Sequence, residues 1–365
     1  MAQLWSNAVP TEGEALSRSV GWGRIAQGVG FLLGLGLLAW CVSIVLSPDN
    51  REQLSHLLDA SALDVAILLA CSAATLILNG LIFWIVLWPV KHTSVLHISA
   101  VNAVATLISY APFKIAVAFR VLVHNRIDGV PILTIGAWFA AIAVLAVTVL
   151  FPAAAASVWL DSRSASWWIA WIGGAIVCTA LVVALASAFA GDPGWHRLMR
   201  MIRAVGLGFA VRWLGTEHGR RLHAGIDMLA HVRASAAAGA CRVADILVQA
   251  VRVWIAARIL HVDLDWGASM VIASTYFLIA MISPIGMLGP REFISVSVAT
   301  MAGISAEEGT ETIMTIVLFI SASEALVYLA GGGIGAAYLR IDRWLLGRVK
   351  SDDPTIPRCE HSDEA

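Results

Sequence analysis

The segment Ile282–Val296 constrains the fold of this chain more than any other stretch. It lies within strongly apolar sequence, yet it contains Pro284, Pro290, two glycines and the adjacent pair Arg291–Glu292. Proline removes a backbone donor and glycine destabilises a helix interior, so an unbroken helix is not expected here. In lipid, every freed backbone group needs a partner inside protein or in a water-filled cavity. We therefore predict a broken helix at membrane depth.

A weaker counterpart lies in the first half of the chain. At Ile108–His124, apolar sequence is interrupted by Pro112, Lys114 and Arg120. Two interrupted apolar segments in matching places, each with charge at the break, are typical of a transport site built from broken helices.

Composition identifies the class of protein. The chain is 59% hydrophobic and 13% charged, whereas about a quarter of the residues in a soluble domain are charged. We predict an all-α integral membrane protein, a polytopic helical bundle. Runs of about 20 apolar residues are long enough to span a bilayer. About six such full spans are predicted: Gly23–Leu46, Ala62–Val90, Pro131–Val158, Ser166–Ala190, Ala236–Leu260 and Thr312–Leu339.

The two interrupted segments are read as re-entrant broken-helix hairpins. The first has arms over roughly 96–110 and 113–125, and the second runs from about 267 to 303 with its break at Pro284–Pro290. The arms of the first are each too short to cross a bilayer comfortably. A single kinked span is the alternative for the first segment.

The distribution of charge predicts the topology. Arg and Lys gather at 18–24, 91, 191–235 and 340–350, while 47–61, 262–266 and 304–311 are acidic. The positive-inside rule places the basic set in the cytoplasm. Each half then has two spans, a hairpin and one span, in opposite orientations, which is an inverted-topology repeat. The predicted divisions are an N-terminal segment 1–21, a transmembrane domain 22–345 with repeats 22–160 and 165–340, and a tail 346–365.

The basic insertion 191–235 is the one sizeable polar region inside the domain. Within it, His196–Trp213 alternates Arg with apolar residues, which suits a basic amphipathic helix on an anionic inner leaflet. A solvated loop helix is the alternative.

Both breaks carry motifs of a known family. Gly289-Pro290-Arg291-Glu292 resembles the glycine-rich Gly-x-Arg-Glu motif of the lysylphosphatidylglycerol synthase/flippase transmembrane-region family. The family's first-half motif, Pro-x-Arg-x-Gly-Glu-x-x-Arg, is similar to Pro112–Arg120, with Lys114 for the first Arg and Ala116-Val117 for Gly-Glu. The resemblance covers roughly residues 20–345. It implies a stand-alone flippase-type member without the aminoacyl-transferase domain.

Charged side chains at membrane depth are functional candidates, because each costs at least about 2.5–3.5 kcal/mol to insert. Arg291 is expected to hold a lipid phosphate, with Glu292 orienting it or carrying a coupling proton. The alternative is a pair that only fixes the hairpin. The predicted substrate-binding residues lie at the two breaks and on the last span: Arg291, Glu292, Gly289, Pro290, Pro112, Lys114, Arg120 and Glu324.

A second set is predicted to line the path, namely Arg242, Asp245, Arg252, Asn79 and Asn102. The spacing of the first three places them on one helical face. A neutralised structural pair is the alternative for Arg242–Asp245, and hydrogen bonding between helices is the alternative for the asparagines. The alternative for Lys114 and Arg120 is that their side chains extend to the inner membrane–water interface and do not contact a substrate.

We predict that the protein moves an anionic phospholipid or lipid-linked intermediate between leaflets. The alternative is an intramembrane lipid-modifying transferase that uses a carboxylate such as Glu292. The sequence contains no zinc-protease His-Glu-x-x-His and no nucleotide-binding glycine loop. A membrane scaffold would not explain paired broken segments with charge. No catalytic residue, metal or cofactor is predicted.

The expected partner is a membrane phospholipid or lipid-linked substrate and not a nucleic acid, in keeping with a net charge of −1. The sequence leaves open a homodimer or an association with a lipid-synthesis enzyme. Five scattered cysteines predict neither disulfides nor a metal site. We expect a multi-pass protein of a bacterial-type cytoplasmic (inner) membrane with both termini in the cytoplasm.

Overall fold

The computed structural model describes residues 59–110, 115–161, 164–206, 208–282, 289–301 and 309–341, together with Gly36, Ala39 and Ser43. Every regular element within these ranges is an α-helix, as composition predicted. Several predicted features lie outside the described residues. They are most of the first span (23–46), the acidic segment 47–58, the breaks at 111–114 and 283–288, the acidic segment 302–308 and the C-terminal tail.

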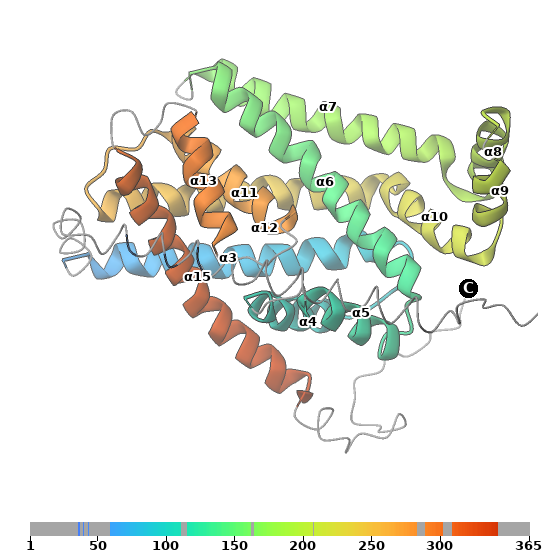
Figure 1. The fold of residues 1–365 in the computed structure, drawn as a ribbon, viewed down its shortest axis with the longest axis horizontal. Coiled ribbons are helices and arrows are strands. Elements are labelled where there is room, and N and C mark those ends of the chain that lie inside the picture. The colour runs from blue at the N-terminus through green and yellow to red at the C-terminus, as the bar shows by residue number, and fades with distance from the viewer. Residues whose placement is uncertain are drawn as a thin grey trace, which may run out of the picture.

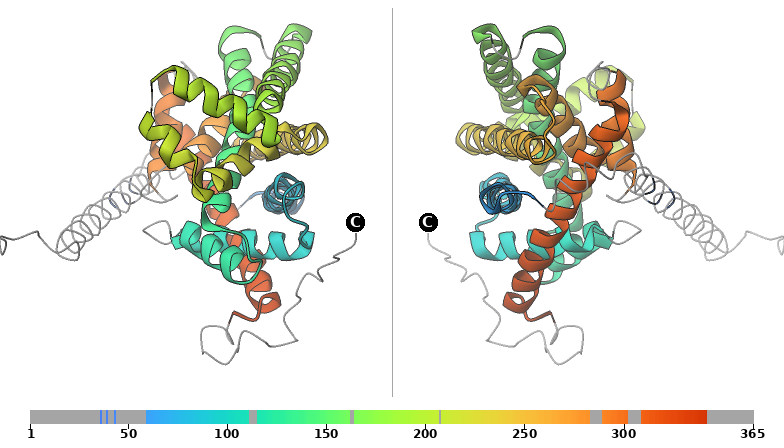
Figure 2. Two further views of the ribbon diagram at one scale, coloured as in Figure 1. Left: turned by 90° about the vertical axis from the view of Figure 1, so that its right-hand side faces the viewer. Right: turned by 90° about the vertical axis from the view of Figure 1, so that its left-hand side faces the viewer.

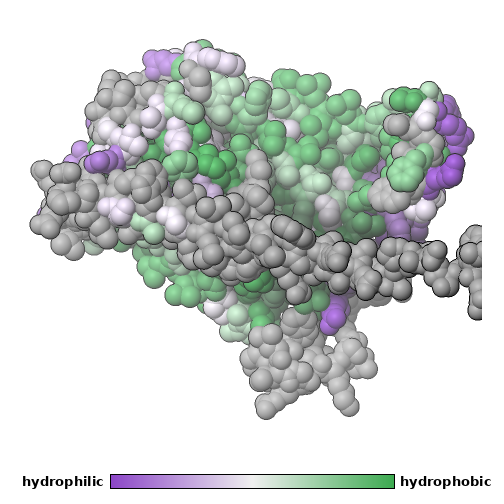
Figure 3. All heavy atoms as spheres, in the orientation of Figure 1, coloured by the Kyte–Doolittle hydropathy of each residue, from purple (hydrophilic) through white to green (hydrophobic). Residues whose placement is uncertain are grey.

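Four described helices are long and apolar enough to cross a membrane: α3 (Ala62–Leu87), α6 (Ile132–Trp159), α7 (Ala165–Phe189) and α15 (Thr310–Tyr338). Their bounds lie close to those predicted from the apolar runs. Large apolar side chains are exposed along them, such as Ile77 at 60%, Phe151 at 66% and Ile176 at 64%. Figure 3 shows the resulting broad apolar surface over the middle of the molecule, with hydrophilic residues towards its ends. The chain is a multi-pass membrane protein.

Helix α11 (Val232–Ile259) is as long as these four but is not uniformly apolar. It lies beside α3, and Figure 2 views both helices nearly along their axes. The two run antiparallel: Asp64 near the start of α3 pairs with Arg258 near the end of α11, and Trp88 at the end of α3 contacts His231 at the start of α11. The polar residues of α11 share one buried face, as their spacing predicted: Arg242, Asp245, Gln249 and Arg252.

Four shorter helices form two pairs. The first helix pair is α4 (Val95–Ile108) and α5 (Ile115–Arg126), and the second helix pair is α12 (Trp266–Ile282) and α13 (Pro290–Met301). None is as long as the roughly 20 residues of a span. Helices α4 and α5 contact each other, as do α12 and α13. In Figure 1 the two pairs lie towards opposite ends of α3 and α11.

The basic insertion is helical and covers one end of the bundle (Figure 1). It consists of α8 (Gly191–Ala204), α9 (Gly208–Leu214) and α10 (Glu217–Ala230). The helix expected over 196–213 is interrupted, because α8 ends at Ala204 and Gly206 takes φ 81°. Helix α10 packs against α6 and α7 and buries His223 and Met228. Helix α10 is therefore a packed part of the fold, whereas most residues of α8, such as Arg200 and Arg203, are exposed.

Candidate functional site

A cavity of about 350 Å³ lies between the long helices and the two helix pairs. We call it the central cavity. Its wall is mainly apolar, with side chains such as Phe83, Phe139 and Phe277. Six of the residues singled out from the sequence also line it: Asn79, Asn102, Arg120, Arg242, Arg291 and Glu324. Helices far apart in the chain thus bring the predicted charges to one place.

The motif Gly289–Glu292 forms the start of α13. Gly289 takes φ 86°, which favours glycine, and Pro290 occupies the first helical position, where its missing N–H costs nothing. The Gly289 N–H donates to Glu292 Oε2 at 2.7 Å. This is the reciprocal half of a capping box, in which the third helical residue reaches back to the residue before the helix. The conformation of the motif therefore fixes the direction of Arg291.

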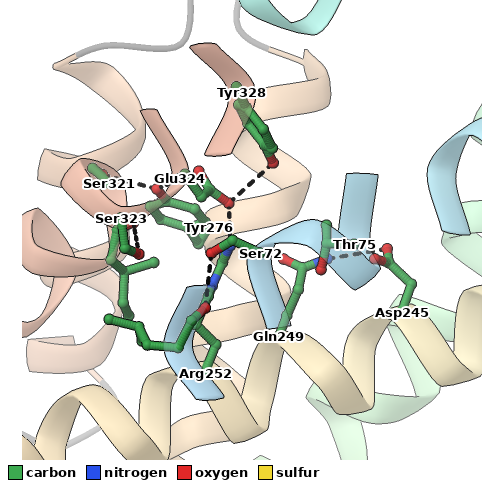
Figure 4. A network of polar contacts seen from close by, with 12 residues as sticks. Ser72, Thr75, Asp245, Gln249, Arg252, Tyr276, Ser321, Ser323, Glu324 and Tyr328 are labelled. Atoms are coloured by element: carbon green, nitrogen blue, oxygen red, sulfur yellow. Dashed lines mark hydrogen bonds and ion pairs between the residues drawn. The ribbon is translucent and has the colours of Figure 1, made fainter. Parts of the chain in front are cut away.

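Arg291 enters a buried group of polar residues around Glu324, of which Figure 4 shows Tyr276 and Tyr328 beside Glu324. We call this group the Glu324 network, and it consists of Arg252, Tyr276, Arg291, Glu292, Ser321, Glu324 and Tyr328. Glu324 accepts hydrogen bonds from Arg252 Nη1 at 2.5 Å and Arg291 Nη1 at 2.9 Å. The hydroxyls of Tyr276 and Tyr328 donate to the same carboxylate at 3.0 and 3.3 Å.

Glu292 completes the network behind the cavity wall. Its Oε1 accepts from Arg291 Nη2 at 3.1 Å and from the Ser321 hydroxyl at 2.7 Å. The Arg291 guanidinium also lies over the Tyr276 ring, 4.0 Å from its centroid. Two arginines thus face two glutamates, and the formal charge of the network is zero. Such full pairing offsets the cost of burying four ions, which is several kcal/mol for each when unpaired.

A second neutral group lies on the wall formed by α3 and α11. Arg242 Nη1 donates to Asp245 Oδ2 at 2.6 Å and to Asn79 Oδ1 at 3.1 Å. Gln249 donates to the same Asp245 oxygen at 3.1 Å. The structural pair that the sequence left open for Arg242 and Asp245 therefore forms, and Asn79 joins α3 to α11.

Arg120 differs from these arginines because no acidic side chain of the described residues lies within ion-pair distance of it. Its Nη2 donates to Asn102 Oδ1 at 2.8 Å, and its guanidinium carbon lies 4.9 Å from the centroid of the Phe83 ring. Its Nε and the Asn102 Nδ2 are buried without a hydrogen-bond partner. Among the described residues, the wall of the central cavity therefore has one arginine without an acidic partner, and the Thr75 hydroxyl on the same wall is also buried without a hydrogen-bond partner.

The sequence did not point to a cluster that joins the ends of the first helix pair. Asp128, in the loop after α5, lies 2.6 Å from His124 Nδ1 and 3.1 Å from His97 Nε2, and all three side chains are buried. Burial raises the pKa of the Asp128 carboxyl, but the contacts with His124 and His97 outweigh burial and lower the pKa from 3.8 to about 2. We call the cluster the histidine clasp. The one-turn spacing of His124 and Asp128 was the available signal.

The remaining sequence-predicted residues fall into two groups. Arg252, Asp245 and Glu292 lie behind the cavity wall and contact residues that line it. Pro112 and Lys114 lie outside the described residues. The hydroxyl groups of Tyr276, Ser321 and Tyr328 were not predicted, although Ser321 and Tyr328 are one turn from Glu324 on α15.

Comparison with known proteins identifies the family of the chain. The family model for the lysylphosphatidylglycerol synthase transmembrane region matches residues 29–332. This chain belongs to that family. The match includes both helix pairs, and the resemblance drawn from the Gly289–Glu292 and Pro112–Arg120 motifs is confirmed. No curated protein and no solved structure matches the chain. Membership in the lysylphosphatidylglycerol synthase transmembrane-region family indicates a lipid-related function in a membrane.

Proposed function

We propose that this protein moves an anionic phospholipid or lipid-linked intermediate between membrane leaflets, and that Arg120 holds the phosphate of the headgroup in the central cavity. The observation that carries the proposal is the lack of an acidic partner for Arg120 among the described residues, while Arg242, Arg252 and Arg291 each have one. Arg120 is partly buried, and the loss of water around an unpaired ion carries a cost in free energy. A bound phosphate would remove that cost and accept more than one N–H bond from the guanidinium.

The neighbours of Arg120 support the same ligand. Asn102 presents an unused amide donor, and Phe83 and Phe139 give the cavity an apolar side. Ligand sites of this kind combine mainly apolar walls with a few polar groups that fix orientation. A lipid has both parts, a charged headgroup and apolar chains.

The arrangement of the helix pairs supports alternating access about this site. Helix α4 packs on α3 and α15, while α12 packs on α11 and α6. In the predicted repeats, α3 corresponds to α11 and α6 to α15, so the two sets of contacts are equivalent. Helices α3 and α11 also run antiparallel. These relations support the proposed inverted repeat with two re-entrant hairpins.

The transferase alternative is weaker. Glu292 does not line the central cavity, and its two oxygens accept bonds from Gly289, Arg291 and Ser321. A carboxylate acting as nucleophile or base must reach the reacting atom. Glu292 would first have to give up four hydrogen bonds in the interior of the protein.

The test is leaflet exchange of labelled lipids in proteoliposomes. We expect the wild type to accelerate exchange of phosphatidylglycerol over protein-free vesicles, and Arg120→Gln to lower that rate about tenfold or more, because a bound phosphate loses its charged partner. Arg126→Gln removes an exposed arginine from the same helix and serves as the matched control, with a rate close to wild type. Exchange equal to that of empty vesicles for every anionic lipid would refute the proposal.

A further inference from the structure

A second pocket, of about 410 Å³, lies where α3 ends and α6 begins, away from the central cavity. We call it the surface pocket. Its side chains come from the end of α3, the loop before α6 and the start of α10. They include Val90, Lys91, Thr134, Glu217, Arg220 and Arg221, and none of these six lines the central cavity.

The surface pocket has an excess of positive charge. Arg221 pairs with Glu217 at 2.5 Å, and that pair is neutral. Arg220 lies 3.5 Å from Asp192, but both side chains are largely exposed, at 63% and 77%. Ion pairs of that kind contribute at most about 1 kcal/mol. Lys91 has no acidic partner among the described residues. Lys91 and Arg220 are therefore available to bind an anion in the surface pocket.

The start of α6 adds backbone donors to the same place. Pro131 and Thr134 line the pocket, and no side chain caps this helix. The first backbone bond of the helix runs from the Ile135 N–H to the Pro131 carbonyl at 3.0 Å. The N–H groups of the three residues between them have no carbonyl partner within the helix. A helix N-terminus with three nearby cations is a favourable site for a phosphate group.

The surroundings of the pocket indicate a lipid. Val90 lines it and is 42% exposed, and Ile132 and Trp88 close by are 58% and 41% exposed. They belong to the ends of two membrane-spanning helices, where exposed tryptophan marks the membrane–water interface. A ligand here would have its phosphate among the cations and its apolar part against these side chains.

We propose that the surface pocket binds the phosphate of an anionic phospholipid from the adjacent leaflet as a second lipid site. The site is independent of the transport proposal, because it shares no residue with the central cavity. Its ligand contacts the loop Gly129–Pro131, which follows Asp128 of the histidine clasp. A bound lipid would thereby stabilise the end of the first helix pair that contains the histidine clasp.

The experiment is native mass spectrometry of the full-length protein in detergent, titrated with short-chain phosphatidylglycerol. All samples carry Arg120→Gln, so that binding in the central cavity is weakened. On that background, Lys91→Gln/Arg221→Gln is compared with Arg200→Gln/Arg203→Gln, which removes two exposed charges from α8. We expect the pocket variant to weaken the apparent Kd for the lipid about tenfold or more, and the α8 variant to leave it within about twofold.

Two controls are needed. One distinguishes a lipid headgroup from free phosphate, and the other shows whether each variant is folded. Inorganic phosphate is titrated alone, and we expect it not to displace the lipid at the lipid's own Kd. Equal binding of lipid to the two variants would overturn the proposal, and so would displacement by an equal concentration of inorganic phosphate. Melting temperatures of both variants are measured, and Lys91→Gln alone, which leaves the Arg221–Glu217 pair intact, is expected to show part of the same loss.

Discussion

Each helix pair contributes one arginine to the wall of the central cavity, but the two arginines differ in whether an acidic side chain pairs with them. Arg291 of the second helix pair is surrounded by Glu292, Glu324 and Ser321. Arg120 of the first helix pair has an asparagine amide and an aromatic ring. Arg291 therefore joins α13 to α15 through buried ion pairs, whereas Arg120 has no acidic partner among the described residues and is available to a ligand.

One sequence difference from the family motif lies close to Arg120. The family motif has glutamate three residues before its last arginine, and this chain has Val117 there. On α5, residues 117 and 120 are one turn apart, so a glutamate at 117 could pair with Arg120. Val117 lines the central cavity. We therefore expect a carboxylate at position 117 to neutralise Arg120.

The largest effect is expected from Glu324→Gln. The change removes the carboxylate that Arg252 and Arg291 share, and it leaves Arg252 without an acidic partner among the described residues, whereas Arg291 keeps Glu292. Breaking a buried ion pair costs about 3–5 kcal/mol, so we expect a large fall in melting temperature in detergent, or no folded protein. Glu311→Gln, at an exposed position of the same helix, is the control and should melt like wild type.

The comparison itself is tested by replacing each arginine with methionine. Arg291→Met leaves Glu292 without its charged partner, and we expect destabilisation of about 3 kcal/mol. Arg120→Met removes a cation that has no acidic partner among the described residues, so its stability should equal or exceed that of wild type. The measurement is the melting temperature of each variant in detergent, compared with that of wild type. Equal losses would show that the two arginines do not differ.

Val117→Glu sharpens the comparison without removing Arg120. The new carboxylate would neutralise Arg120 in place of a bound anion, so we expect about tenfold weaker binding of anionic lipid, or about 1.4 kcal/mol. Val117→Gln has nearly the same shape without charge and should bind close to wild type. Binding is measured by titration in nanodiscs. Undiminished binding by Val117→Glu would remove Arg120 from the site.

The smallest effect concerns the histidine clasp of the first helix pair. Asp128→Asn keeps the shape but removes the charge between His97 and His124, and we expect a loss of about 1 kcal/mol. Hydrogen exchange at the end of α5 should rise, while exchange in α13 should not change. Uniform change over both helix pairs would argue against a local role.

The same cluster has a defined pH dependence. The folded pKa of Asp128 is about 2 and its usual value is 3.8. A depressed pKa adds stability that is fully present above 3.8 and is lost as the pH falls towards 2. We therefore expect no change in exchange at the end of α5 from Asp128 titration between about pH 5 and 8.

Local sequence patterns were sufficient for much of the fold. Apolar runs gave the spans α3, α6, α7 and α15, because backbone groups in lipid must bond within their own helix. Residue spacing along α11 predicted the buried face that holds Arg242 and Asp245. Pairs one turn apart or adjacent, such as Arg291 and Glu292, followed from the motif alone.

Tertiary structure decided which charges meet. Arg252 and Glu324 are 72 residues apart in the chain, and His97 reaches Asp128 from another helix. No local pattern encodes such partners, because they depend on how helices pack against one another. The sequence by itself predicted that charged side chains lie within apolar segments. It also predicted that they lie near the two proline-containing breaks. Helix packing decided that Glu324 reaches both Arg252 and Arg291, and that no acidic side chain of the described residues lies within ion-pair distance of Arg120.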